Sequence, residues 1–140
     1  MTFSEQLEFT NQYNQFLRHC GIRITVLEPE RCCAELKIED YCKNTGDTVH
    51  GGLLYTMADC VVSAYARAVG DRPVTLSGDF HYLSNVTSGT LTATAVPVRK
   101  GKTVAVLNVT IACGDKLLAT GTFSCFDRGP EKKEPIRKGP

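Results

Sequence analysis

Residues 53–68 read LLYTMADCVVSAYARA, and this run indicates where the centre of the fold lies. It is apolar at almost every position and rich in Ala, Leu and Met, which favour the helical conformation. A surface helix keeps one polar face, so a helix that is apolar on nearly every side belongs inside a protein. We therefore predict a buried helix around which the rest of the chain folds.

The segments on both sides of this helix have the patterns of β-strands. Beyond Thr103, apolar and polar residues alternate, so that Ala105, Leu107, Val109 and Ile111 share one face. Such alternation is typical of an antiparallel sheet with one covered face. The predicted strands are 24–27, 32–38, 74–83, 90–100 and the two halves of 103–126, divided at Gly114 and Asp115. A sheet that curls around the apolar helix would bury it, with the N-terminal helix or a partner chain covering the remainder, so we predict an α+β fold.

Two further segments complete the organisation of a single domain over residues 1–127. Thr2 and Glu5 have the spacing of a capping box, and apolar residues follow at helical intervals. They predict an amphipathic helix over about residues 2–20. The charged segment 128–140 contains three prolines and almost nothing apolar, so we expect a flexible tail.

The composition excludes several classes of function. The 140 residues are 42% hydrophobic, which suffices for one core, and 16 basic residues balance 15 acidic ones, which leaves no basic face for a nucleic acid. No apolar stretch approaches the ~20 residues of a membrane span, and the first residues are too polar for a signal peptide. The seven cysteines show neither a CxxC spacing nor the paired histidines of a zinc site. We expect a cytoplasmic protein with reduced thiols and no bound metal.

Three residues stand where the predicted central helix begins: His50, Gly51 and Gly52. The first N–H groups of a helix have no partner within the helix, and the missing Cβ atoms let another molecule approach them closely. A carbonyl oxygen or an anion would fit there. The alternative is structural: the glycines make a tight turn, and His50 satisfies a local carbonyl group.

Asp59 is an ionisable residue within the otherwise apolar helical run. Burying an unpaired carboxylate costs several kcal/mol, so something must compensate for it. In one interpretation the hydroxyl groups of Thr56 and Ser63, on the same helical stripe, satisfy the carboxylate. In the other, Asp59 is a nucleophile or general base in a dry cleft.

The spacing of these two features limits how they can act together. His50 and Asp59 are nine residues apart, which on a helix separates them by roughly 13 Å along the axis. One substrate carbonyl cannot contact both within a single chain. If both act on one bond, they come from different subunits, and two antiparallel central helices would then form a symmetric dimer with two shared sites.

The run NTGDTVHGGLLYTMAD, residues 44–59, resembles the signature of hotdog-fold acyl-CoA thioesterases of the PaaI type. The similarity continues in the spacing of Thr75 from the Tyr82-Leu83 pair and in the last hairpin, and it covers about residues 20–126. The resemblance implies the hotdog fold, a curved antiparallel β-sheet wrapped around a long central helix. It also implies the hydrolysis of acyl-CoA to a free acid and coenzyme A.

The same resemblance implies a role for each matching residue. Asp59 would activate water or attack the thioester carbon, and Thr75, from the same chain, would hold the attacking water. The N–H of Gly51 would polarise the thioester oxygen, while His50 would orient the substrate carbonyl or its own loop. Asn44 would position the water or the thioester sulfur.

Substrate contacts are expected at both ends of the site. Arg99, Lys100 and Lys102 around Gly101 form a basic turn that would meet the polyanionic coenzyme A, and Lys132 and Lys133 are weaker candidates for the same contact. The acyl side would be lined by residues such as Gly52, Leu54, Tyr55 and Val62. Beyond the coenzyme A of the substrate, no cofactor is expected.

Several features and questions stand apart from this scheme. Family members often carry Arg-Pro after the Tyr-Leu pair, whereas Ser84 and Asn85 follow Tyr82 and Leu83 here. We interpret Cys60 as a packing residue and His81 as a surface or cross-strand residue. A protein that binds acyl-CoA without turnover and a hotdog dehydratase or hydratase are the alternative functions. The resemblance favours a homotetramer built as a dimer of dimers, although the sequence itself does not decide between dimer and tetramer. The acyl specificity and the choice between general base and acyl-enzyme stay open.

Overall fold

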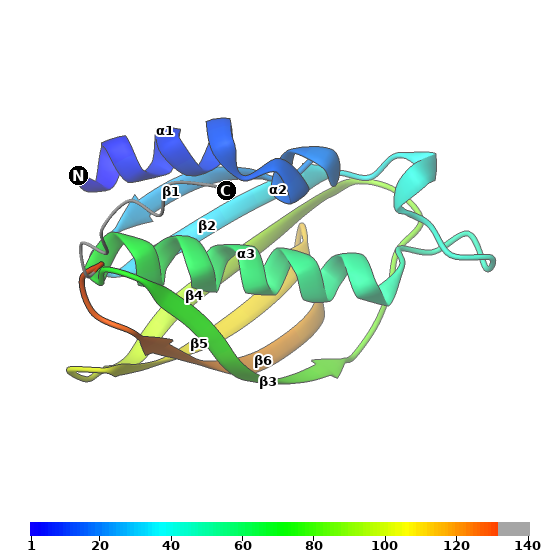
Figure 1. Cartoon of the computed structure of the whole chain (residues 1–140). Helices are drawn as coiled ribbons and strands as arrows, with labels where there is room; N and C mark the ends of the chain where they lie inside the picture. Colours follow the sequence, from blue (N-terminus) through cyan, green and yellow to red (C-terminus); the bar gives the residue numbers. More distant parts are fainter. Residues whose placement is uncertain (132–140) are drawn as a thin grey trace, which may run out of the picture.

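Six antiparallel strands form one curved sheet in the computed structural model, which describes residues 1–131 (Figure 1). Their order across the sheet is β1-β2-β4-β5-β6-β3, so β1 and β3 are the two edges. The strands are β1 (Arg23–Glu28), β2 (Arg31–Lys37), β3 (Pro73–Tyr82), β4 (Thr90–Lys100), β5 (Val104–Cys113) and β6 (Lys116–Asp127). The helices are α1 (Phe3–Tyr13), α2 (Gln15–His19), the short 3₁₀ helix η1 (Asp40–Cys42) and α3 (Gly51–Val69). The predicted α+β fold is confirmed.

The long helix α3 lies across the concave face of the sheet and contributes much of the core (Figure 1). Its buried side chains pack with apolar residues of the sheet, among them Leu91, Leu107, Ile111 and Phe123, which are fully buried. One stripe of α3 stays partly exposed in the single chain: Gly52, Thr56, Asp59, Ser63 and Arg67. The prediction of a buried central helix is therefore right except along this stripe, where the polar residues lie, and at Tyr55, which is also exposed.

The N-terminal helix is interrupted, contrary to the prediction of one helix over residues 2–20. Asn14 ends α1 and begins α2, because its side chain Oδ1 accepts a hydrogen bond from the N–H of Leu17 at 3.1 Å. An asparagine that caps the following helix leaves the helical conformation itself. The predicted cap at the first turn is present, since the hydroxyl oxygen of Thr2 accepts from the N–H of Glu5.

The predicted tail lies mainly outside the described residues. Its first residues return to the domain, because the guanidinium of Arg72 donates to the carbonyl oxygens of Gly129 at 2.9 Å and Pro130 at 3.3 Å. Lys132 and Lys133 lie outside the described residues. Over residues 1–131, no helix is long and apolar enough to cross a membrane, and no cluster of three metal-ligating side chains occurs.

Candidate active site

Helix α3 begins with a side-chain cap. Nδ1 of His50 accepts a hydrogen bond from the N–H of Gly52 at 2.8 Å, and the N–H of His50 donates to the carbonyl oxygen of Cys42 at 2.8 Å. The structural alternative for His50, in which it satisfies a local carbonyl group, is therefore wrong in that detail, because the imidazole accepts from the backbone N–H of Gly52. This cap fixes the tautomer of a neutral imidazole, whose Nε2 would carry the proton.

The N–H of Gly51 donates to no acceptor among residues 1–131. The carbonyl oxygen of His50, in the same peptide group, accepts from the N–H groups of Leu53 and Leu54 at 3.0 and 3.3 Å inside the helix. Because a trans peptide points its N–H and C=O in opposite directions, the Gly51 N–H points out of the helix end. It is therefore available to an oxygen atom of a bound molecule, at the positive end of the helix dipole.

Tyr82 packs directly against this glycine. Its hydroxyl group donates to the carbonyl oxygen of Gly51 at 3.2 Å, and a Cβ atom on Gly51 would lie only 3.1 Å from the Tyr82 ring. A larger residue here would therefore require the Tyr82 ring to shift.

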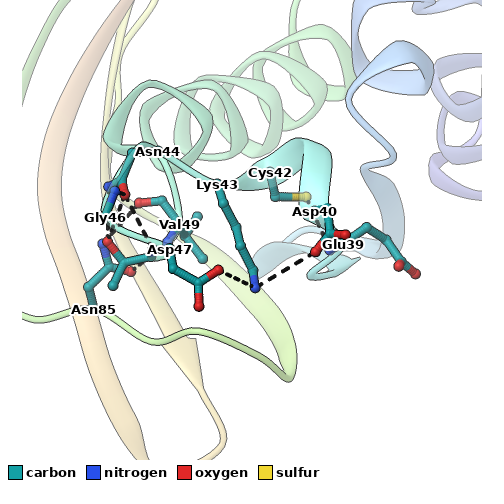
Figure 2. Close-up of polar contacts among 10 residues, drawn as sticks. Glu39, Asp40, Cys42, Lys43, Asn44, Gly46, Asp47, Val49 and Asn85 are labelled. Carbon is teal, nitrogen blue, oxygen red and sulfur yellow. Dashed lines mark hydrogen bonds and ion pairs between the residues drawn. The ribbon is translucent and has the colours of Figure 1, made fainter.

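The loop before α3 is held by its own polar side chains (Figure 2). Oδ1 of Asn44 accepts from the N–H groups of Gly46 at 2.8 Å and Thr48 at 3.2 Å, and Nδ2 donates to the Thr48 hydroxyl. The ammonium group of Lys43 lies 3.0 Å from a carboxylate oxygen of Asp47 and 3.9 Å from one of Asp40. Asn44 therefore shapes the loop beside the start of α3.

The carboxylate of Asp59 lies near the middle of α3 and is half-buried. Its Oδ1 accepts a hydrogen bond from the hydroxyl group of Thr75, on β3, at 2.7 Å. Thr56 and Ser63 are not its partners, contrary to the structural interpretation, since Thr56 donates to the Gly52 carbonyl at 2.9 Å. The single chain thus joins Asp59 and Thr75, which are 16 residues apart in the sequence.

The predicted catalytic residues therefore form two groups in one chain. His50 and Gly51, with Asn44 in the preceding loop, surround the start of α3, while Asp59 and Thr75 meet farther along it. Continuous helix connects the two groups, which keeps them roughly 13 Å apart along its axis. One chain does not bring them together.

A groove of about 430 Å³ adjoins the start of α3. Two exposed aromatic side chains, Phe16 and Tyr41, line it, and the Tyr41 hydroxyl donates to the carbonyl oxygen of Cys20 at 2.9 Å. The remaining lining residues are His19, Cys20, Cys42, Lys43, His50, Gly52, Leu53 and Thr56. An apolar group bound here would lie beside His50 and Gly52, the two neighbours of Gly51 in the chain.

The predicted acyl contacts lie in different environments. Leu54 and Val62 are fully buried in the core and present no surface to a ligand in this structure. Tyr55 is 37% exposed, and its ring lies 5.5 Å from that of Phe80 and 5.4 Å from that of Phe123. Of these three, only Tyr55 is accessible.

The basic turn of Arg99, Lys100, Gly101 and Lys102 lies at the other end of α3. Part of it lines a small cavity of about 50 Å³ together with Val69, the last residue of the helix. In one chain this turn is therefore far from His50 and Gly51.

Cys60 and His81 have the positions that the sequence predicted. Burial raises the pKa of the Cys60 thiol to about 12, so the thiol is protonated at neutral pH and serves as a packing group. His81 is exposed on β3, with Nε2 3.6 Å from a carboxylate oxygen of Asp79.

Comparison with known protein families and solved structures identifies proteins that are similar to this chain. The model of a family described as the thioesterase superfamily matches residues 46–120. No curated protein sequence matches the chain.

Several solved structures share the fold. The PaaI protein of Escherichia coli, from the phenylacetic acid degradation operon, has a TM-score of 0.80 at 20% identity, with 92% of this chain and 98% of that chain covered. A thioesterase from Haemophilus influenzae has a TM-score of 0.82 at 22% identity, covering 92% and 94%. A mutant of the phenylacetic acid degradation protein PaaI from Thermus thermophilus has a TM-score of 0.76 at 26% identity, covering 80% and 97%.

Proposed function

The chain belongs to the thioesterase superfamily, and from this premise we propose that it hydrolyses acyl-CoA thioesters to a free acid and coenzyme A. The observation that carries the proposal is the carboxylate of Asp59, which lies on the partly exposed polar stripe of α3 and is held by the Thr75 hydroxyl at 2.7 Å. A thioester is already activated toward attack, so one carboxylate and one oxyanion donor are sufficient machinery.

In the proposed reaction, Asp59 accepts a proton from a water molecule whose oxygen attacks the thioester carbon. Negative charge then develops on the carbonyl oxygen, where the N–H of Gly51 stabilises it. The C–S bond breaks, and the sulfur of coenzyme A leaves with the proton. Direct attack by Asp59 would give an acyl-enzyme and, after its hydrolysis, the same products. Asn44 and His50 would hold the loop and the helix end that present the Gly51 N–H.

A shared site requires a dimer, in which two α3 helices lie antiparallel so that His50 and Gly51 of one chain face Asp59 and Thr75 of the other. Two features support this arrangement. The polar stripe of α3 stays partly exposed, and the edge strand β3 carries exposed aliphatic side chains, with Leu76 59% exposed. An edge strand with such side chains is suited to pairing with a second copy. Pairing of two such dimers would give a tetramer.

The antiparallel arrangement also gives the basic turn a role. Reversing the partner helix would bring its C-terminal end, with its Arg99–Lys102 turn, toward the start of this chain's α3. The turn could then meet the phosphate groups of coenzyme A, while the thioester lies at Gly51.

The acyl group of the substrate would lie in the groove lined by Phe16 and Tyr41, since that groove adjoins His50 and Gly52. All seven cysteines are free thiols, which supports work in the reducing cytoplasm.

The test is release of free thiol from a panel of acyl-CoA thioesters that differ in chain length and aromaticity. Replacing Asp59 by Asn keeps the shape of the side chain and should lower kcat by orders of magnitude while the fold is kept. Equal turnover by the wild type and Asp59→Asn would exclude the carboxylate mechanism. A protein that binds acyl-CoA and never releases thiol would favour a binding or sensor function instead.

A further inference from the structure

The segment after β3 contacts the residue that precedes His50 through one asparagine side chain. Nδ2 of Asn85 donates to the carbonyl oxygen of Val49 at 2.9 Å, and Oδ1 of Asn85 accepts from the N–H of Val49 at 3.2 Å. Figure 2 shows Asn85 beside Val49 below the start of α3. One amide group thus pairs with both backbone groups of a single residue, as a neighbouring strand would.

Asn85 is itself held in place. Its Oδ1 also accepts from the N–H of Val86 at 2.8 Å, and its carbonyl oxygen accepts from the ammonium group of Lys116, at the start of β6, at 2.8 Å. The N–H of Val49 lies 3.3 Å from the carbonyl oxygen of Val86, so the same segment contacts Val49 through its backbone. These contacts connect Val49 to the rigid sheet through Asn85.

Val49 controls how the chain enters α3. Its side chain is fully buried, and the next residue, His50, is held from the other side by its bond to the Cys42 carbonyl. A shift of the Val49 backbone would move the peptide group between Val49 and His50 and, through it, the next peptide group, between His50 and Gly51. The two bonds of the Asn85 amide therefore contribute to the direction of the Gly51 N–H, together with the bonds of Val49 to the Val86 carbonyl and of His50 to the Cys42 carbonyl.

We propose that Asn85 is a positioning residue: its side chain fixes the backbone of Val49 and thereby aims the Gly51 N–H at the oxygen of a bound thioester. The part of the proposal that concerns the thioester rests on the proposed function; the part that concerns the Gly51 N–H does not. Asn85 does not touch the substrate in this scheme and acts only through the chain between Val49 and Gly51.

Two variants and one matched control test the proposal. Asn85→Ala removes both bonds to Val49, whereas Asn85→Asp keeps the acceptor and replaces only the donor. Asn108→Ala is the control, because Asn108 is an exposed residue of β5 that accepts from the Thr122 hydroxyl on the sheet, with no contact to the loop. Since a displacement of about 1 Å can cost about 10²-fold in rate, we expect Asn85→Ala to lower kcat by at least about tenfold with KM little changed. Asn85→Asp should lose at least as much activity as Asn85→Ala, because a carboxylate oxygen would face the Val49 carbonyl oxygen in place of the amide donor, and the control should match the wild type.

A second measurement separates positioning from a general loss of stability. The amide resonance of Gly51 should shift, and amide hydrogen exchange at Gly52 and Leu53 should accelerate, in both Asn85 variants, while exchange in the central strands stays as in the wild type. A lowered melting temperature with wild-type kcat and an unshifted Gly51 resonance would overturn the proposal. If the wild type released no thiol from any thioester, the proposed function would fail, but the resonance and exchange measurements would still decide whether Asn85 positions Gly51.

Discussion

Replacing Thr75 by Val removes the hydroxyl group that donates to Asp59 and keeps the size and β-branching of the side chain. In the structure this hydroxyl fixes Oδ1 of the carboxylate at 2.7 Å and leaves Oδ2 free to act on water. Without the bond, the carboxylate can rotate away from the position in which it meets a substrate. The variant therefore separates the orientation of the carboxylate from its presence.

The size of the effect follows from the bond and its surroundings. A hydrogen bond to a charged group contributes about 1.5–3 kcal/mol, and the low end applies here because Thr75 is exposed and Asp59 is only half-buried. One factor of ten in rate corresponds to about 1.4 kcal/mol. We therefore expect kcat/KM to fall about tenfold in Thr75→Val, well short of the loss in Asp59→Asn.

The assay is thiol release from one acyl-CoA, measured for the wild type, Thr75→Val, Thr75→Ser and Asp59→Asn. Thr75→Ser keeps the hydroxyl group and should retain most of the activity, which separates loss of the bond from a change of shape. Thr75→Val with wild-type kcat/KM, beside an inactive Asp59→Asn, would refute the claim that this bond orients the carboxylate.

Three other variants test separate features of the structure. Phe16→Ala should raise KM for thioesters with long or aromatic acyl groups and leave acetyl-CoA turnover unchanged, because only the larger acyl groups would reach the groove lined by Phe16 and Tyr41. Equal effects on every thioester in the steady-state assay would exclude this groove as the site of the acyl group. The backbone N–H groups of Asp71, Arg72 and Gly129 hold the pKa of Asp127 below its ordinary value, so its stabilising effect is present above that ordinary value and is lost as the pH falls through the lowered pKa. Asp127→Asn should therefore melt at a lower temperature than the wild type near neutral pH, with a difference that closes in acid, and a difference independent of pH would contradict this. Cys60→Ala should keep kcat within about twofold, because Cys60 is a packing residue. In the native protein, the Cys60 thiol should resist alkylation at about pH 8, because it is buried and protonated. Modification of Cys60, detected by mass spectrometry of the alkylated peptides, would contradict this assignment.

The central helix could be predicted because its composition alone requires burial. The run of apolar residues in α3 leaves only the interior as an environment, and the alternation in β5 predicts which face of the sheet it covers. The break at Asn14 could not be predicted in the same way, because the apolar spacing continues through it. An asparagine can lie inside a helix or cap the next one, and the choice depends on what α2 packs against.

Contacts between distant segments account for what the sequence missed at the site. The resemblance predicts Thr75 in the same site as Asp59, but the direct bond between them joins β3 to α3, and no local spacing encodes it. Helical spacing alone favours Thr56 and Ser63 as the hydroxyl partners of Asp59, because they lie on the same helix. In the sequence, Asn85 is only a departure from Arg-Pro, because its two bonds to Val49 depend on how the segment after β3 passes the start of α3. Leu54 was expected at the substrate, but the direction in which its side chain points is set by the packing of the helix on the sheet.

The exposed edge strand β3 affects the tendency of the newly synthesised polypeptide to aggregate. Its outer backbone groups have no strand partner among residues 1–131, and Val74 and Leu76 are exposed along it. An uncovered edge with exposed aliphatic side chains can add a strand from an unfolded or foreign chain, which makes it a site where aggregation can begin. A newly made chain would thus be most prone to aggregation at the β3 edge when the concentration of its own copies is low, because pairing with a second copy would cover that edge. A charged residue in place of Leu76 should suppress aggregation of the isolated chain and, by the same change, weaken the proposed pairing of two chains.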